Sequence, residues 1–191
     1  VRIGPVTAPN RFYQVPHCTG MGYARPRGLA AMREVKAEGG WGVVCTEYTS
    51  IHPSSEDEPM QSGALWDDDD VRALALMVDG VHRHGSLAGI ELWHGGSADH
   101  NGMTREETLG PMSMPAAALD PVQSRRMDKR DIRDLKHWHA AAARRAVSAG
   151  FDIVYVYATH GYLLSQFLSP VNQRSDEYGG SLENRVRIVR E

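Results

Sequence analysis

Four side chains that could do chemistry come just after predicted strands: Cys18, Tyr48, Tyr157 and His160. A thiol can act as a nucleophile, while a phenol and an imidazole can hold or transfer a proton. Taken singly, each is as well explained by packing, and Cys45, in the middle of a strand, is assigned to packing. Cys18 differs because it follows a strand end and precedes glycine, so its sulfur is expected to face an open site.

A carboxylate and several histidines need a separate explanation. Glu91 lies inside an apolar strand, where a buried carboxylate needs a hydrogen-bond donor, and a ligand N–H could serve. His94, Asp99, His100 and His160 could suggest a metal site, but their spacing matches no ligand motif. We therefore predict no metal site, and His94 and His160 taken singly could be structural histidines.

The elements that position these residues alternate along the chain. Strands are predicted over 10–16, 41–47 and 87–93, and a fourth, expected to be fully buried, opens at Phe151. Helices are predicted over 27–38, from the Asp67–Asp70 run to Gly85, from Asp128 to Gly150, and over 181–191. The segment 97–127 has no clear periodicity, and a connection this long suggests a lid or a small hairpin.

This alternation predicts an α/β fold with a parallel sheet and right-handed crossovers. A complete (β/α)8 TIM barrel needs about 250 residues, so the chain is expected to hold the first four βα units of one. A flavodoxin-like open sheet is the alternative, but no glycine-rich phosphate turn follows the first strand. In a barrel the strand ends converge on one mouth, where catalytic residues sit.

Composition excludes some classes of function. The 191 residues carry 21 Lys and Arg against 24 Asp and Glu, a net charge of −3, so neither nucleic acid nor an anionic membrane is an expected partner. No apolar run approaches about 20 residues, and two cysteines do not make a disulfide framework. A cytoplasmic location is the default. The chain stops inside a predicted helix, so we expect it to be part of a longer protein.

Several segments resemble the Old Yellow Enzyme family of FMN-dependent (β/α)8 barrels. Residues 160–170 and 172–185 resemble the family's signature after strand four, 91–96 its strand-three motif, and 10–11 its strand-one entry. Within the family, residues 11–18, 36–41 and 151–157 look most like trimethylamine dehydrogenase and related amine dehydrogenases and N-demethylases. The resemblance implies that residues 1–191 are the N-terminal part of one FMN-binding barrel domain.

The resemblance also implies a cofactor site. Pro16, His17 and Cys18 lie in the segment whose cysteine is bonded to FMN in the amine dehydrogenases, so Cys18 would form a thioether with flavin C6. Glu91, where many relatives have Gln, would hydrogen-bond the pyrimidine edge, and Tyr48 would also line the site. An iron–sulfur (4Fe-4S) cluster would lie only beyond Glu191, as would the barrel's last four strands.

The implied reaction is oxidative N-demethylation of a small methylated amine, with an unspecified electron acceptor, in a homo-oligomer. Tyr48 would be an aromatic wall of the amine pocket, and Tyr157 and His160 would lie over the flavin beside the substrate. One departure is that a single residue separates Pro170 from Asn172, where the amine dehydrogenases have one more. The strand-four loop is therefore expected to differ.

Three other functions stay open. The first is an NAD(P)H-dependent ene- or dienoyl-reductase of the Old Yellow Enzyme type, in which a Tyr or His would protonate the substrate. The second is an inactive, truncated half-barrel, whose open sheet edges would predict self-association. The isolated fragment is expected to be inactive. The third is a metal-dependent barrel hydrolase.

Overall fold

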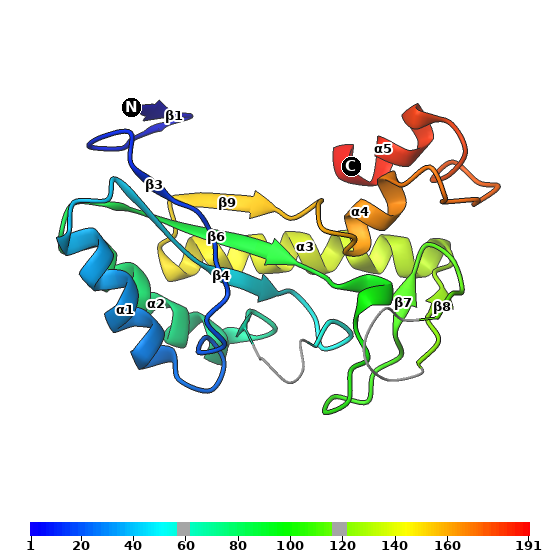
Figure 1. Ribbon diagram of the computed structural model, residues 1–191, viewed down its shortest axis with the longest axis horizontal. Helices are drawn as coiled ribbons and strands as arrows, with labels where there is room; N and C mark the ends of the chain where they lie inside the picture. The colour runs from blue at the N-terminus through cyan, green and yellow to red at the C-terminus, as the bar shows by residue number, and fades with distance from the viewer. Residues whose placement is uncertain (57–61, 116–121) are drawn as a thin grey trace. The chain divides into compact units, whose positions relative to one another are not determined.

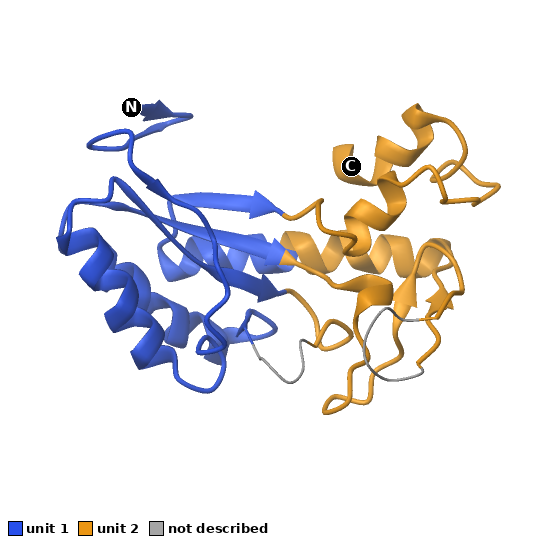
Figure 2. Ribbon diagram, in the orientation of Figure 1, with its two compact units in different colours: residues 1–50, 60–92, 141–156 blue, residues 51–59, 93–140, 157–191 orange. Residues whose placement is uncertain are grey.

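A computed structural model describes residues 1–56, 62–115 and 122–191. The chain divides into two compact units, drawn in different colours in Figure 2. Unit 1 comprises Val1–Ser50, Met60–Leu92 and Ala141–Val156, and unit 2 comprises Ile51–Pro59, Trp93–Ala140 and Tyr157–Glu191.

Unit 1 is built on the main sheet (Figure 1). Its strands run in the order β3 (Tyr13–Gln14), β4 (Val43–Ser50), β6 (Leu87–Trp93) and β9 (Ile153–Val156), with β5 (Gly63–Ala64) beside β4. The β3–β4, β4–β5 and β6–β9 pairs are parallel. Non-consecutive neighbours joined through helices are the arrangement that the βα alternation predicts.

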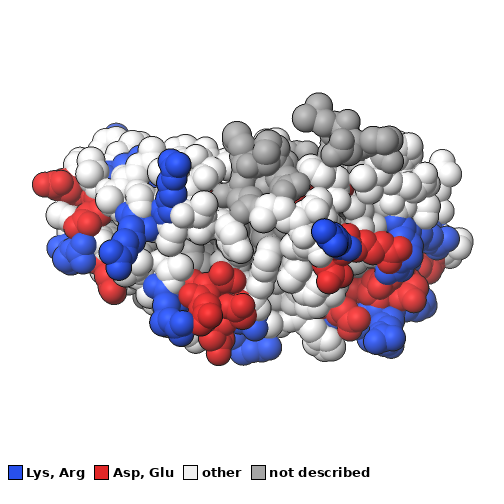
Figure 3. All heavy atoms as spheres, turned by 90° about the horizontal axis from the view of Figure 1, so that it is seen from below, with Lys and Arg blue, Asp and Glu red and all other residues white. Residues whose placement is uncertain are grey.

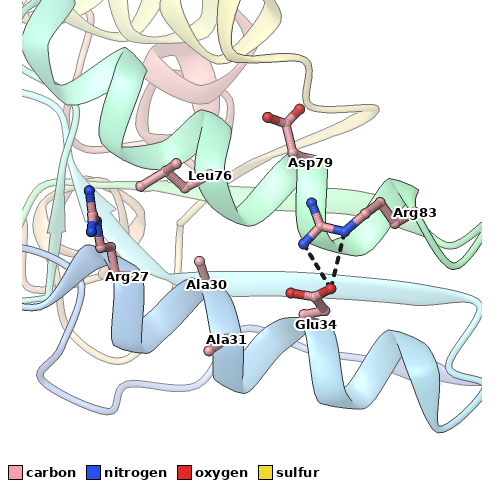
Figure 4. Close-up of a pocket in the computed structure, with 7 residues that line it drawn as sticks. All are labelled: Arg27, Ala30, Ala31, Glu34, Leu76, Asp79 and Arg83. Carbon is pink, nitrogen blue, oxygen red and sulfur yellow. Dashed lines mark hydrogen bonds and ion pairs between the residues drawn. The ribbon is translucent and has the colours of Figure 1, made fainter.

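Helices α1 (Pro26–Glu38) and α2 (Asp68–His82) pack against each other in unit 1. Asp67 caps α2 by accepting the N–H groups of Asp69 and Asp70, while the Asp70 carboxylate accepts the N–H of Asp67. The acidic run is therefore a capping box, as expected of a helix start. Arg83 pairs with Glu34 beside an open groove of about 280 Å³ between the two helices (Figure 4). None of the predicted site residues lines this groove.

One hydrophobic cluster of unit 1 includes residues of the main sheet. Val43 and Cys45 are buried there, and Tyr13 and Tyr155 pack against them. Cys45 is 0% exposed, which confirms its assignment to packing. A short antiparallel pair, β1 (Arg2–Ile3) with β2 (Val6–Thr7), precedes the sheet and was not predicted from the sequence.

Three of the strand predictions need correction. The first strand is only Tyr13–Gln14 rather than 10–16, and the second runs to Ser50 instead of ending at Glu47. The expectation that the fourth strand is fully buried is wrong. Its side chains alternate between half-buried and exposed, and Val156 is 53% exposed. The reason is that, within the described residues, β9 pairs only with β6 and forms an edge.

Unit 2 contains η1 (Gly96–Ala98), β7 (Leu109–Gly110), β8 (Arg125–Arg126), α4 (Leu163–Leu168), α5 (Leu182–Arg190) and the first part of α3 (Lys129–Ala149). β7 and β8 both fall in the 97–127 segment and pair in parallel, so they do not form the small hairpin that was one of the two expectations. Residues 116–121 of that segment lie outside the described residues. Asp128 caps α3 as predicted, accepting the N–H groups of Arg130 and Asp131.

Much of the signature segment after strand four has a structural role. The side-chain amide of Asn172 donates to the carbonyls of Phe167 and Tyr178. The buried guanidinium of Arg174 donates to the carbonyls of Pro111 and Met127 and pairs with Asp176. These contacts satisfy backbone carbonyls inside unit 2 and hold the loop that follows α4.

The described residues include no helix long and apolar enough to cross a membrane. On the face drawn in Figure 3, basic and acidic side chains lie in small mixed groups and do not form a field of one sign. Ion pairs between solvent-accessible side chains include Arg83 with Glu34 and Lys129 with Glu177. Such a surface agrees with the near-balanced composition.

Candidate functional site

The thiol of Cys18 is half-buried and lies in hydrogen-bonding contact with the hydroxyl of Tyr48. Burial raises the pKa of Cys18, and the contact with Tyr48 opposes that rise. Tyr48 belongs to β4, whereas Cys18 lies in the loop after β3, so two neighbouring strands bring them together. The structure thus joins two of the predicted site residues at the carboxyl ends of parallel strands.

A buried carboxylate organises the loop that follows Cys18. Glu47, 0% exposed, accepts four consecutive backbone N–H groups. The donors are Thr19 (2.6 Å), Gly20 (2.8 Å), Met21 (3.1 Å) and Gly22 (2.6 Å). Glu47 was not singled out from the sequence, although a carboxylate in an apolar strand is the signal that identified Glu91.

The segment before Cys18 is fixed from helix α1. Arg33, also 0% exposed, donates to the backbone carbonyl of His17 at 2.8 Å and lies 3.0 Å from ring atom Nδ1 of His17. Local desolvation and then the charge of Arg33 lower the pKa of His17. Pro16, the residue before His17, is half-buried. Arg33 was also missed, but it shares a helical face with Leu29 and Ala37, where an arginine is unusual.

Glu91 is half-buried on β6, in register with Tyr155 of β9. Burial raises the pKa of Glu91 to about 7, and in the described part of the chain its carboxylate has no hydrogen-bond or ion-pair partner. Tyr155 contacts the sulfur of Cys45 at 3.7 Å, and burial raises its pKa to about 12. Glu91 is therefore a half-buried carboxyl group whose protonated form is favoured by burial.

Tyr157 and His160 meet in unit 2. The phenol oxygen of Tyr157 lies 2.5 Å from Nδ1 of His160, and His160 has a φ of 56°, in the left-handed region. The ring of Tyr162 lies 5.3 Å from that of Tyr157 and 5.2 Å from that of Trp93. Tyr162 therefore belongs to the same aromatic group as Tyr157 and Trp93, and it was not singled out from the sequence.

His94 is a structural histidine. It is buried, with Nε2 3.1 Å from the hydroxyl of Ser54 and Nδ1 accepting the N–H of Gly96. Burial lowers the pKa of His94 well below its usual value. Among the described residues, no group of three or more His, Cys, Asp or Glu side chains could hold a metal ion.

A model of the NADH:flavin oxidoreductase / NADH oxidase family matches residues 1–191. The chain belongs to this family. It is 43% identical to a dimethylamine dehydrogenase from Hyphomicrobium sp. (strain x), over 98% of this chain and 26% of the relative. It superposes on the structure of histamine dehydrogenase from Rhizobium sp. 4-9 with a TM-score of 0.96 and 50% identity, over 100% of this chain and 28% of that one.

The old yellow enzyme homologue from Zymomonas mobilis is also similar, with a TM-score of 0.88 and 30% identity over 99% of this chain and 56% of that one. These structures confirm the predicted α/β class and the partial (β/α)8 barrel, and the family resemblance is confirmed with them. The chain spans between about a quarter and somewhat over half of these proteins' lengths.

Unit 1 has groups that fit a flavin. The buried hydroxyl of Thr19 has no hydrogen-bond partner within the described ranges, and neither does the carboxylate of Glu91. A buried polar atom without a partner is costly, and a flavin ring carries both N–H and carbonyl groups. Thr19 and Glu91 are therefore chemically suited to polar groups of the family's flavin.

Proposed function

We propose that residues 1–191 are the N-terminal part of one FMN-binding barrel domain, and that the longer protein oxidises a small methylated amine with loss of a methyl group. The contact between Cys18 and Tyr48 carries this proposal, because it sets a thiol beside an aromatic hydroxyl at the strand ends. The two relatives named for dimethylamine and histamine support an amine substrate.

Cys18, with Pro16 and His17 beside it, would hold FMN through a thioether bond. Glu91 would accept a hydrogen bond from a flavin N–H. This bond would account for a half-buried carboxylate with no partner among the described residues. Bound FMN would supply the two-electron acceptor for the amine, and the protein's part is to position and tune it. An electron acceptor outside the chain would then reoxidise the flavin.

Tyr48 would offer an aromatic face to the alkylammonium, a contact worth about 0.5–2 kcal/mol. Tyr157 and His160 would govern the proton of the amine, which must lose it before oxidation. If Tyr157 donates to Nδ1 of His160, the phenol oxygen keeps lone pairs that can accept an N–H. This pair would therefore orient the amine as well as relay its proton.

The test is to give the full-length protein dimethylamine or trimethylamine with an artificial electron-accepting dye. We expect dye reduction that depends on the amine, with one formaldehyde released for each two electrons transferred. Dye reduction without formaldehyde would leave amine oxidation but overturn demethylation. No amine-dependent reduction would overturn the proposed function.

The second candidate is an NAD(P)H-dependent ene- or dienoyl-reductase, favoured by the likeness to the old yellow enzyme homologue. The hydroxyl of Tyr162, in the aromatic group with Tyr157, could then protonate the substrate. Oxidation of NADH or NADPH that depends on an α,β-unsaturated ketone, without amine-dependent turnover, would favour this function.

A further inference from the structure

Cys18 lies between two segments that are each held by a buried, charged side chain. On the N-terminal side, Arg33 fixes the backbone carbonyl of His17. On the C-terminal side, Glu47 accepts the N–H groups of residues 19–22, two for each carboxylate oxygen. A carboxylate with four such donors is fully satisfied, so it fixes the loop strongly.

Glu47 is also linked to the thiol itself. Burial raises the pKa of the Cys18 thiol and the Glu47 carboxylate adds to that rise, while Tyr48, the next residue in β4, contacts the same thiol. Consecutive residues of one strand therefore fix both the loop that carries the sulfur and the hydroxyl that the sulfur meets. A small shift of either would separate the thiol from Tyr48.

The loop has little freedom to adjust. Gly20 has a φ of 68°, a conformation that favours glycine. A Cβ at Gly22 would lie 2.6 Å from the backbone nitrogen of Gly63 and 3.1 Å from Oε1 of Glu47. The loop is thus packed between β5 and the carboxylate, and its position depends on Glu47.

We propose that Glu47 is a positioning residue for Cys18, holding the 19–22 loop so that the thiol faces the flavin site. The inference rests on the proposed function, in which Cys18 bonds the flavin. Glu47 is not proposed to contact the flavin or the amine.

The first experiment measures covalent flavin in the full-length Glu47→Gln variant. Glutamine keeps the size of the side chain, but its NH₂ group would face N–H donors of the loop, so two of the four bonds are lost. We expect the covalent flavin per chain to fall about tenfold, because displacing a reacting atom by about 1 Å can cost even more in rate.

Glu56→Gln is the matched control. Glu56 is another buried carboxylate that accepts backbone N–H groups, those of Met103 and Thr104, but in unit 2. Its replacement is expected to lower the thermal unfolding midpoint without changing the covalent flavin. A general loss of stability would instead affect both variants alike.

The second experiment reads the thiol without flavin. Flavin-free full-length protein is treated with iodoacetamide at pH 8, and the tryptic peptide Phe12–Arg27, which contains Cys18, is followed by mass spectrometry. Burial raises the pKa of Cys18 and the charge of Glu47 adds to that rise, so we expect alkylation to be several-fold faster in Glu47→Gln and unchanged in Glu56→Gln.

If Glu47→Gln does not fold, Gly20→Ala moves the same loop and is expected to reduce covalent flavin in the same way. Wild-type levels of covalent flavin in whichever of these variants folds, with unchanged alkylation of Cys18, would overturn the inference. If the wild-type flavin proves not to be covalent, that part of the proposed function fails, and the alkylation comparison still decides the role of Glu47.

Discussion

The phenol oxygen of Tyr157 lies 2.5 Å from Nδ1 of His160, a residue held in the left-handed backbone region with a φ of 56°. Such a backbone is costly for a residue other than glycine and is often retained where it places a side chain for function. The preceding strand, β9, ends at Val156, so the pair stands directly after a strand.

Replacing the hydroxyl of Tyr157 tests whether this pair handles the amine proton. In the full-length protein, Tyr157→Phe is expected to lower kcat for amine-dependent dye reduction by about 100-fold or more, the range for lost acid–base catalysis. His160→Asn, which tolerates a positive φ, should cause a similar loss. Tyr23→Phe, at a tyrosine that is 49% exposed, is the control. Wild-type rates and an unchanged pH profile in both variants would remove the pair from the mechanism.

Glu91 should make the stability of the flavin-free protein depend on pH. Its pKa is raised to about 7 in the folded protein, so the unfolded chain loses this proton first as the pH rises from about 4.5. Stability is therefore greatest below that range and falls as the pH approaches 7, by about 1–2 kcal/mol after discounting for partial exposure.

The variant Glu91→Gln should be free of this loss, so its thermal unfolding midpoint at pH 8 should exceed that of the wild type. Glu38→Gln, at an exposed position, is the control and should retain the wild-type pH dependence. Parallel pH profiles for wild type and Glu91→Gln would show that Glu91 titrates normally.

Arg174 tests whether the signature segment is structural. Arg174→Ala removes the donors to the carbonyls of Pro111 and Met127 and leaves Asp176 unpaired, so it should cost about 3–5 kcal/mol of unfolding free energy. Arg72→Ala, at an exposed pair with Asp69, should cost less than about 1 kcal/mol. Denaturant unfolding of the full-length variants measures both, and equal costs would contradict the structural role.

The isolated 191-residue chain should self-associate. The edge strand β9 exposes Val154 and Val156, and an unpaired apolar edge is a template for other chains. Light scattering on the purified chain should show oligomers, and the double variant Val154→Lys with Val156→Lys should shift them toward monomer. A wild-type chain that stays monomeric at high concentration would show that the half-barrel alone is self-sufficient.

Elements with strong local signals were predicted well from the sequence. The strand over 87–93 was placed with its observed bounds, and the acidic run before α2 forms a capping box. The exposed edge of β9 was missed because an apolar run predicts a buried strand whether or not a neighbouring strand is present. The parallel pairing of β7 with β8 was missed because two-residue strands carry no periodicity.

The site was predicted unevenly for a physical reason. Cys18 and Tyr48 were singled out by their positions after predicted strands, and Glu91 as a carboxylate inside an apolar strand. Glu47 and Arg33 act on the backbone of a loop that lies far from them in the chain, and only the folded structure shows these contacts. The spacing of residues in the sequence does not show which buried charged side chains bond the loop and which lack a protein partner.

The most direct test of the proposed function is where the flavin goes when the full-length protein is denatured in acid and centrifuged. Flavin absorbance is recorded in the pellet and the supernatant for the wild type and for Cys18→Ala. We predict flavin in the wild-type pellet and its loss from the pellet in Cys18→Ala. Flavin found only in the supernatant of the wild type would contradict the covalent link through Cys18.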